Sequence, residues 1–69
     1  MKYNHRRLGK ARRDAGLDLR AAAKLAGLLP RHLRLLEAGV SVPRSDTLAR
    51  IATAYQKAVD FFFVESAAA

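Results

Sequence analysis

Three glycines, spaced eleven and twelve residues apart at Gly16, Gly27 and Gly39, restrict this chain to short helices. Glycine adopts the left-handed conformation that ends a helix without steric cost, so each position suits a helix stop. The segments between the glycines carry apolar residues at intervals of three and four, which is typical of amphipathic helices. No run alternates between polar and apolar residues as a strand would. We therefore expect short helices joined by tight turns, and no sheet.

Caps, a proline and apolar spacing set the expected helix boundaries. Asn4, Asp18 and Ser45 are candidate N-caps, because their side-chain oxygens can accept free N–H groups of a first helical turn. Pro30 suits the first turn of a third helix, where a missing N–H costs nothing. The expected helices are residues 5–15, 19–26, a segment from Pro30 to Gly39, a segment after Ser45, and residues 59–64. The positions predicted to face the core are Leu8, Ala11, Ala15, Leu19, Ala22, Ala23, Ala26, Leu29, Leu33, Leu36, Leu48, Ile51, Ala52 and Tyr55.

Positive charge is concentrated in the first half of the 69 residues. The whole chain has 13 Lys and Arg against 6 Asp and Glu, a formal net charge of +7. Residues 1–34 hold ten of the basic and two of the acidic residues, whereas residues 35–69 hold three and four. This asymmetry favours a polyanionic partner for the first half. The absence of cysteine excludes a disulfide framework and a thiolate metal site.

The segment around Gly27 has the spacing of two helices that cross at a tight turn. Ala23 offers a small side chain where the helices would touch, and Gly27 tolerates a positive φ in the turn. Leu28 is expected to point inward after the turn. Leu33 and Leu36, three residues apart, would anchor the second helix to the core. The spacing predicts a helix-turn-helix.

A longer pattern runs without gaps from about residue 8 to residue 63. Its residues are Arg12, Gly16-Leu17, Ala23, Gly27, Leu33, Leu36, Glu37, Gly39, Pro43, Thr47-Leu48, Ile51-Ala52 and Asp60. In these residues the chain resembles the Cro/phage-repressor type of helix-turn-helix regulator, often called XRE-like. The resemblance implies an all-α fold, a compact lambda-repressor-like bundle of four to five short helices. It would occupy residues 1–65 as a single domain, with a short tail at 66–69.

The resemblance also implies a partner and a mode of binding. The partner would be double-stranded DNA, bound by a homodimer. From the residues themselves, we expect the protein in the cytoplasm and on the nucleoid, without a cofactor or a metal. The third helix would lie in the major groove, with the start of the second helix and the loop after the third on phosphates. The candidate base contacts are Arg31, Arg34, Leu35, His32 and Pro30. The candidate phosphate contacts are Arg20, Lys24, Ser41, Arg44 and Lys10.

The chemistry of these side chains suits DNA. Arg31 and Arg34 can donate to guanine O6 and N7 or to phosphates, and Leu35 can pack on a thymine methyl group. The alternative is that the two arginines only form a solvated helix face. By the family pattern, Arg12 and Glu37 form a structural ion pair between the first and third helices.

Some positions depart from the family pattern. Leu19 stands where a phosphate-binding Gln is usual, Leu29 where a Ser or Thr caps the third helix, and Gln56 where a Gly is usual. Pro30 and Leu35 stand where polar base-reading side chains are frequent. Largely electrostatic or shape-based binding is therefore an alternative to detailed base readout.

Three consecutive phenylalanines follow the fourth predicted helix. The family pattern turns Phe62 inward and leaves Phe63 partly buried, whereas Phe61 takes a position that is usually polar and exposed. We expect Phe61 and Phe63 to contact a second copy of the chain or another protein. The alternative is a satellite core beneath Tyr3.

The sequence thus supports a DNA-binding transcriptional regulator, acting as a repressor or autoregulator. An antitoxin-like regulator that acts mainly through a protein partner is the alternative. A cationic membrane-surface binder is disfavoured, because the glycines divide the basic residues among separate helices. An enzyme is not expected: there are no paired carboxylates and no Gly-rich phosphate loop, and His5 and His32 are interpreted as surface or interface histidines.

Overall fold

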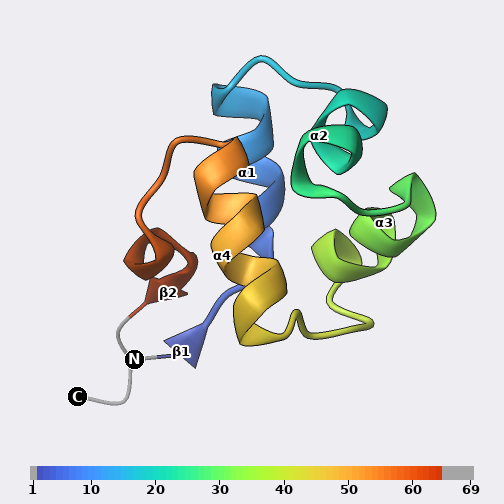
Figure 1. Ribbon diagram of the computed structural model, residues 1–69. Coiled ribbons are helices and arrows are strands. Elements are labelled where there is room, and N and C mark those ends of the chain that lie inside the picture. The colour runs from blue at the N-terminus through green and yellow to red at the C-terminus, as the bar shows by residue number, and fades with distance from the viewer. Residues whose placement is uncertain (1, 65–69) are drawn as a thin grey trace.

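The computed structural model describes residues 2–64, and four α-helices account for most of them (Figure 1). The elements are β1 (Lys2–Tyr3), α1 (Arg6–Asp14), α2 (Leu19–Ala26), α3 (Pro30–Ala38), α4 (Ser45–Ala54), the 3₁₀ helix η1 (Val59–Phe62) and β2 (Phe63–Val64). The predicted helical fold class is therefore confirmed. None of the helices within these residues has the length and apolar character needed to cross a bilayer. The predicted tail at 66–69 lies outside the described residues.

The prediction that the chain forms no strand is wrong. β1 pairs with β2 in an antiparallel ladder in which Tyr3 lies opposite Phe63. The N–H of Asn4 extends the ladder by donating to the carbonyl oxygen of Phe62 at 2.8 Å. Strands of two residues are too short to show an alternating pattern, so only the pairing of residues 2–3 with residues 63–64 reveals them. The helix predicted over 59–64 is accordingly limited to η1.

Left-handed residues end the helices. Gly16, Gly27 and Gly39 have φ values of 72°, 71° and 81°, as predicted for helix stops. Gln56, which follows α4 in place of the usual glycine, also has a positive φ, at 56°. This conformation costs a residue with a Cβ about 1–2 kcal/mol. The N–H of Gln56 donates to the carbonyl oxygen of Thr53 at 3.2 Å and so closes the turn.

Side chains at two of the three predicted cap positions accept an N–H at the start of a helix, although His5 is the residue directly before α1. Asp18 caps α2, because its Oδ1 accepts the N–H of Ala21 at 2.8 Å. Asn4 makes the predicted contact at the start of α1, where its Oδ1 accepts the N–H two residues further on at 2.9 Å. The prediction for Ser45 is wrong. Ser45 is the first residue of α4, and Arg44 takes the cap position without a side-chain hydrogen bond.

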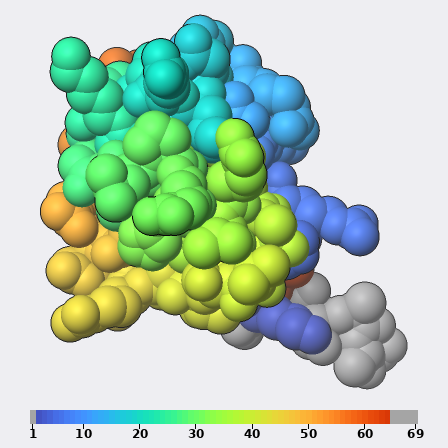
Figure 2. Space-filling model, turned by 90° about the vertical axis from the view of Figure 1, so that its right-hand side faces the viewer, coloured from blue at the N-terminus to red at the C-terminus, as the bar shows by residue number. Residues whose placement is uncertain are grey.

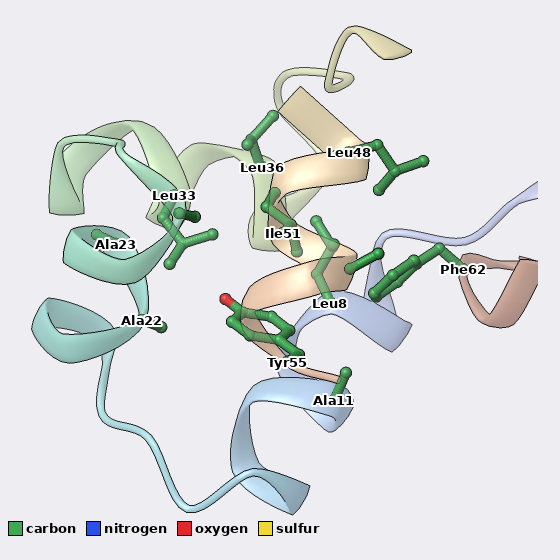
Figure 3. Packing of buried hydrophobic residues seen from close by; sticks show 12 residues of the cluster. Leu8, Ala11, Ala22, Ala23, Leu33, Leu36, Leu48, Ile51, Tyr55 and Phe62 are labelled. Atoms are coloured by element: carbon green, nitrogen blue, oxygen red, sulfur yellow. The ribbon is translucent and has the colours of Figure 1, made fainter. Parts of the chain in front are cut away.

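One core holds the helices together (Figure 3). Its largest fully buried side chains come from α1, α3, α4 and η1: Phe62, Leu8, Leu33, Leu36 and Ile51. On α2 the buried residues are all alanines, so α3 and α4 can approach its backbone closely. Two predicted core positions are wrong. Ala15 is exposed because it caps the end of α1, and Leu29 is exposed because it precedes α3 and lies off its inner face.

Candidate nucleic-acid interface

α3 lies at the centre of one face of the molecule. Figure 2 shows α3 in green on this face, with α2 in cyan above it and the start of α4 in yellow below. Three residues separate α2 from α3, and the N–H of Leu28 closes their turn on the carbonyl oxygen of Ala23 at 2.8 Å. Leu33 and Leu36 are completely buried, so they fix which side of α3 faces outward.

Most of the basic side chains predicted for this face are exposed on it. They are Arg20 and Lys24 on α2, Arg31, His32 and Arg34 on α3, and Arg44 before α4. Within residues 2–64, the four Arg and Lys side chains of α2 and α3 form no salt bridge. Arg44 approaches Asp46 only at 3.9 Å, and its side chain is 88% exposed. The positive charge of this face is therefore available to an external anion.

The other predicted DNA contacts differ in their placement. On or next to α3, Leu35 is 38% exposed, and Pro30 and Ser41 are half-buried. Lys10 is not joined to this group. Its Nζ lies 3.3 Å from Oδ2 of Asp14, which is also 3.9 Å from Nζ of Lys57. Lys10 thus belongs to a charged cluster between α1 and the segment that follows α4.

An ion pair ties α1 to the C-terminal end of α3. Nε of Arg12 donates to Oε2 of Glu37 at 2.8 Å, and Nη2 donates to Oε1 at 3.2 Å. A third guanidinium N–H donates to the carbonyl oxygen of Leu17 at 3.1 Å. The side chains of Arg12 and Glu37 are only 17% and 16% exposed. The hydrogen bond to Glu37 raises the pKa of the Arg12 guanidinium above its ordinary value. This geometry is that of a structural pair: the guanidinium of Arg12 is directed at Glu37 and is not part of the exposed basic face around α3.

A second tie to the end of α3 comes from His5, directly before α1, which the sequence predicts to be a surface or interface histidine. Its Nδ1 donates to the carbonyl oxygen of Glu37 at 2.9 Å. The imidazole ring lies so close to Gly39 that a Cβ there would come within 2.8 Å of it. The two partners are 32 residues apart, so no local pattern signals the contact.

The helix N-termini on this face are not equivalent. At α2, the carboxylate of Asp18 already accepts an N–H of the first turn and adds negative charge there. At α3, Leu29 provides no side-chain acceptor, which leaves the first-turn N–H groups without a capping oxygen. Free N–H groups at a helix N-terminus suit a phosphate. Arg50, which the sequence did not indicate, adds a cation near the turn, since its Nη1 would lie 3.5 Å from a Cβ on Gly27.

The phenylalanines lie on the other side of the molecule, against the β-ladder and α1. Phe62 is completely buried and Phe63 is half-buried, as predicted. The ring of Phe63 meets that of Tyr3 edge to face, with centroids 6.0 Å apart. Phe61 is half-buried, with Nζ of Lys57 4.6 Å from its ring centroid and the guanidinium of Arg7 at 5.1 Å. Both outer rings therefore have partners within the chain, and only part of each remains for another molecule.

Comparison with known proteins agrees with this geometry. The chain matches the helix-turn-helix family of the Cro/C1 (XRE) type over residues 8–62. That range includes α1 from Leu8 onward, the whole of α2, α3 and α4, and most of the buried core. A search of curated proteins found no match. The crossing of α2 and α3 at Gly27, the exposed basic α3 and the match over most of the chain lead to one conclusion: the chain belongs to the Cro/C1-type helix-turn-helix family of DNA-binding regulators.

Proposed function

We propose that this protein is a sequence-specific regulator of transcription that inserts α3 into the major groove of double-stranded DNA. The observation that carries the proposal is the outer side of α3, where Arg31 and Arg34 are exposed and form no salt bridge with residues 2–64. A helix with its side chains is about 10–12 Å wide, which matches a major groove about 12 Å wide. In this position the arginines donate to guanine edges or to phosphates.

Phosphate contacts on both sides of the groove orient α3. Arg20 and Lys24 on α2 would bind one side, and Ser41 and Arg44 in the loop after α3 would bind the other. The exposure of the three cations supports this arrangement. Contacts of this kind position a protein on the duplex and make its affinity depend on salt, but they carry no sequence information themselves.

We infer that the regulator acts as a repressor or autoregulator in the cytoplasm and binds as a homodimer. A bound domain of this kind represses by occupying the DNA that polymerase needs. A two-fold dimer would hold two copies of α3 about 34 Å apart, one turn of the duplex, so its site would be roughly palindromic.

A second candidate function is an antitoxin-like regulator that acts mainly through a protein partner. It is supported by a groove of about 600 Å³ between the end of α2 and the outer side of α4. Its lining residues are Leu25, Ala49, Arg50, Thr53, Ala54 and Gln56. Leu25 is 62% exposed there, which suits an apolar side chain from another protein.

The two candidates are distinguished by a fluorescence-anisotropy titration of the purified protein. One duplex is the promoter fragment of its own gene and the other is a scrambled duplex of equal length, each measured over a series of salt concentrations. A regulator that reads sequence should prefer its promoter by about 10³-fold or more. Equal affinity for the two duplexes, falling steeply with salt, would show that the basic face binds phosphates without reading sequence. No binding at low salt would favour the protein partner.

A further inference from the structure

Leu29 has no role in the fold that would explain its side chain. It is 67% exposed, so it contributes little to the core. It occupies the N-cap of α3 without providing a hydrogen bond, although a side-chain oxygen at this position stabilises a helix. Local rules are broken most often where a residue serves a function. The position directly before α3, at the proposed DNA face, suggests what that function is.

The outer side of α3 combines apolar groups with cations. It carries the half-buried Pro30 and Leu35, which is 38% exposed, and the exposed Leu29 lies directly before its first turn. The polar side chains from Leu29 to Leu36 are those of Arg31, His32 and Arg34. This stretch therefore has no amide that would pair with adenine N6 and N7, and no carboxylate that would accept from cytosine N4. What it offers a base edge is the N–H donors of the two arginines, the imidazole of His32 and hydrocarbon.

The edges of base pairs in the major groove carry one apolar group, the C5-methyl of thymine. We propose that Leu29 and Leu35 read thymine methyl groups, so that this protein selects sites by the position of thymines. The inference rests on the proposed function, because it requires α3 to lie in the major groove. Arg31 and Arg34 lie between the two leucines in sequence. Their positive charge complements the phosphates of DNA, so DNA is the partner that this apolar surface suits.

The spacing of the two leucines defines the thymines they reach. Leu29 has an extended backbone before α3, whereas Leu35 lies five residues beyond Pro30, a rise of about 7.5 Å within the helix. Base pairs follow each other at about 3.4 Å, so the thymines read by Leu29 and Leu35 lie about two or more base pairs apart. A purely electrostatic reading of this face predicts no such spacing.

The test compares thymine with uracil, which differs from it only by the methyl group. The protein first enriches its preferred duplexes from a pool with a randomised central segment. The most enriched duplex is then synthesised with thymine and with deoxyuridine at each enriched thymine position in turn. Burial of one methyl group is worth about a fourfold change in affinity, so each thymine that is read should show about that loss on replacement by uracil.

Three variants assign the effect to residues. Leu29→Ser and Leu35→Ser should each abolish the thymine-to-uracil difference at one position, and the two positions should differ. Leu25→Ser is the matched control, since Leu25 is 62% exposed but faces the groove beside α4. It should leave every difference unchanged. Leu29→Ser places a good capping residue before α3, so its loss of discrimination would not be due to unfolding.

The outcomes separate this inference from the proposed function. If the protein enriches a duplex but binds its thymine and uracil forms equally, methyl readout is overturned. The proposal that the protein is a DNA-binding regulator would then still stand. Differences that persist in both leucine variants would also overturn it, because other side chains would then contact the methyl groups. Failure to enrich any duplex would overturn both, and Leu29 would then be better explained as a contact for a protein.

Discussion

Arg31 and Arg34 are the side chains on which DNA affinity should depend most. Arg31→Ala or Arg34→Ala should weaken binding to the preferred duplex by about 1–3 kcal/mol, because each loss removes a donor pair from a base edge or a phosphate. The free energy of unfolding should change by less than about 0.5 kcal/mol, since both side chains are exposed. Anisotropy titrations and urea unfolding measure the two quantities.

The control for these variants is Arg6→Ala, which removes the same charge from the exposed side of α1. It should lower affinity for specific and scrambled duplexes alike, and by less. A change in stability without a change in affinity for Arg31→Ala or Arg34→Ala would show that α3 is not the reading helix.

Glu37 should matter first for stability. Glu37→Ala leaves the guanidinium of Arg12, only 17% exposed, without its carboxylate. Breaking a buried pair in this way costs about 3–5 kcal/mol, and the remaining exposure places the expected loss near about 3 kcal/mol. Urea unfolding measures it. Lys10→Ala, which breaks the exposed pair with Asp14, is the matched control and should cost less than about 1 kcal/mol. Equal losses would mean that the Arg12 pair is as weak as a surface pair.

Tyr55 links stability to alkaline pH. Burial, followed by the nearby negative charge of Glu37, raises the pKa of Tyr55 from 10.0 to about 12. The folded chain therefore keeps the phenolic proton to a higher pH than the unfolded chain. The associated stability is fully present below about pH 10 and is lost as the pH rises toward about 12. Burial raises the pKa of Tyr3 to about 12 as well, so both act in the same window.

Tyr55→Phe tests this linkage. The hydroxyl of Tyr55 is buried and has no hydrogen-bond partner within residues 2–64. Removing it should raise the free energy of unfolding by about 1 kcal/mol at neutral pH and reduce the loss above about pH 10. Urea unfolding at several pH values measures both effects. A destabilised Tyr55→Phe variant would show that the hydroxyl makes a favourable bond.

At the scale of elements, two side chains tie the C-terminal end of α3 to the first helix. Arg12 of α1 binds the carboxylate of Glu37, and His5, directly before α1, donates to its carbonyl oxygen. Gly39 has a φ of 81°, and a Cβ there would meet the ring of His5 at 2.8 Å. Gly16 has a similar φ of 72°, with nothing within 4 Å of a Cβ. Gly16→Ala should therefore cost only the strain of the left-handed conformation, about 1–2 kcal/mol. Gly39→Ala should cost distinctly more in thermal or urea unfolding.

The double variant His5→Ala/Gly39→Ala isolates the contact. It removes the ring that the new Cβ would meet, so Gly39→Ala should be less damaging in the His5→Ala background than in the natural chain. Equal costs in both backgrounds would mean that the backbone conformation alone accounts for the loss. The comparison measures how far α1 fixes the position of the reading helix.

The helices differ in how much of them the sequence predicts. The bounds of α2 were predicted from Asp18 and Gly27, because a cap and a stop act on the nearest turn of the chain. η1 was predicted as part of a longer helix. Residues 63 and 64 pair with the first strand instead, and this pairing takes them out of the helical conformation. Local signals therefore determine a helix until a partner distant in sequence competes for its backbone.

For the whole molecule, the proposed homodimer depends on the end that carries the phenylalanines. Phe61→Glu should convert a dimer to a monomer, because a buried carboxylate would oppose association. Light scattering of the purified protein measures the mass. Val59→Glu is the control, since Val59 is an exposed apolar residue of the same 3₁₀ helix. An unchanged mass for Phe61→Glu would exclude Phe61 from the contact and leave its ring to Lys57 and Arg7.

The candidate site was predicted from the sequence only in part. The basic residues of α2 and α3 could be assigned to one face because helical periodicity relates them to the buried alanines of α2 and the buried leucines of α3. Lys10 was assigned by charge alone, and the structure groups it with Asp14. Charge is a property of a residue, whereas membership of a face depends on how the helices pack.

The sequence by itself determined the short helices, the turn at Gly27 and the inner side of α3, since caps, stops and apolar periods act over a few residues. Tertiary structure alone decided three other features. Residues 2–3 pair with residues 63–64 as strands, His5 reaches Glu37 across 32 residues, and Leu29 is exposed instead of joining the core. Each depends on where separate elements meet, which follows from packing the whole chain and is not encoded in any single segment.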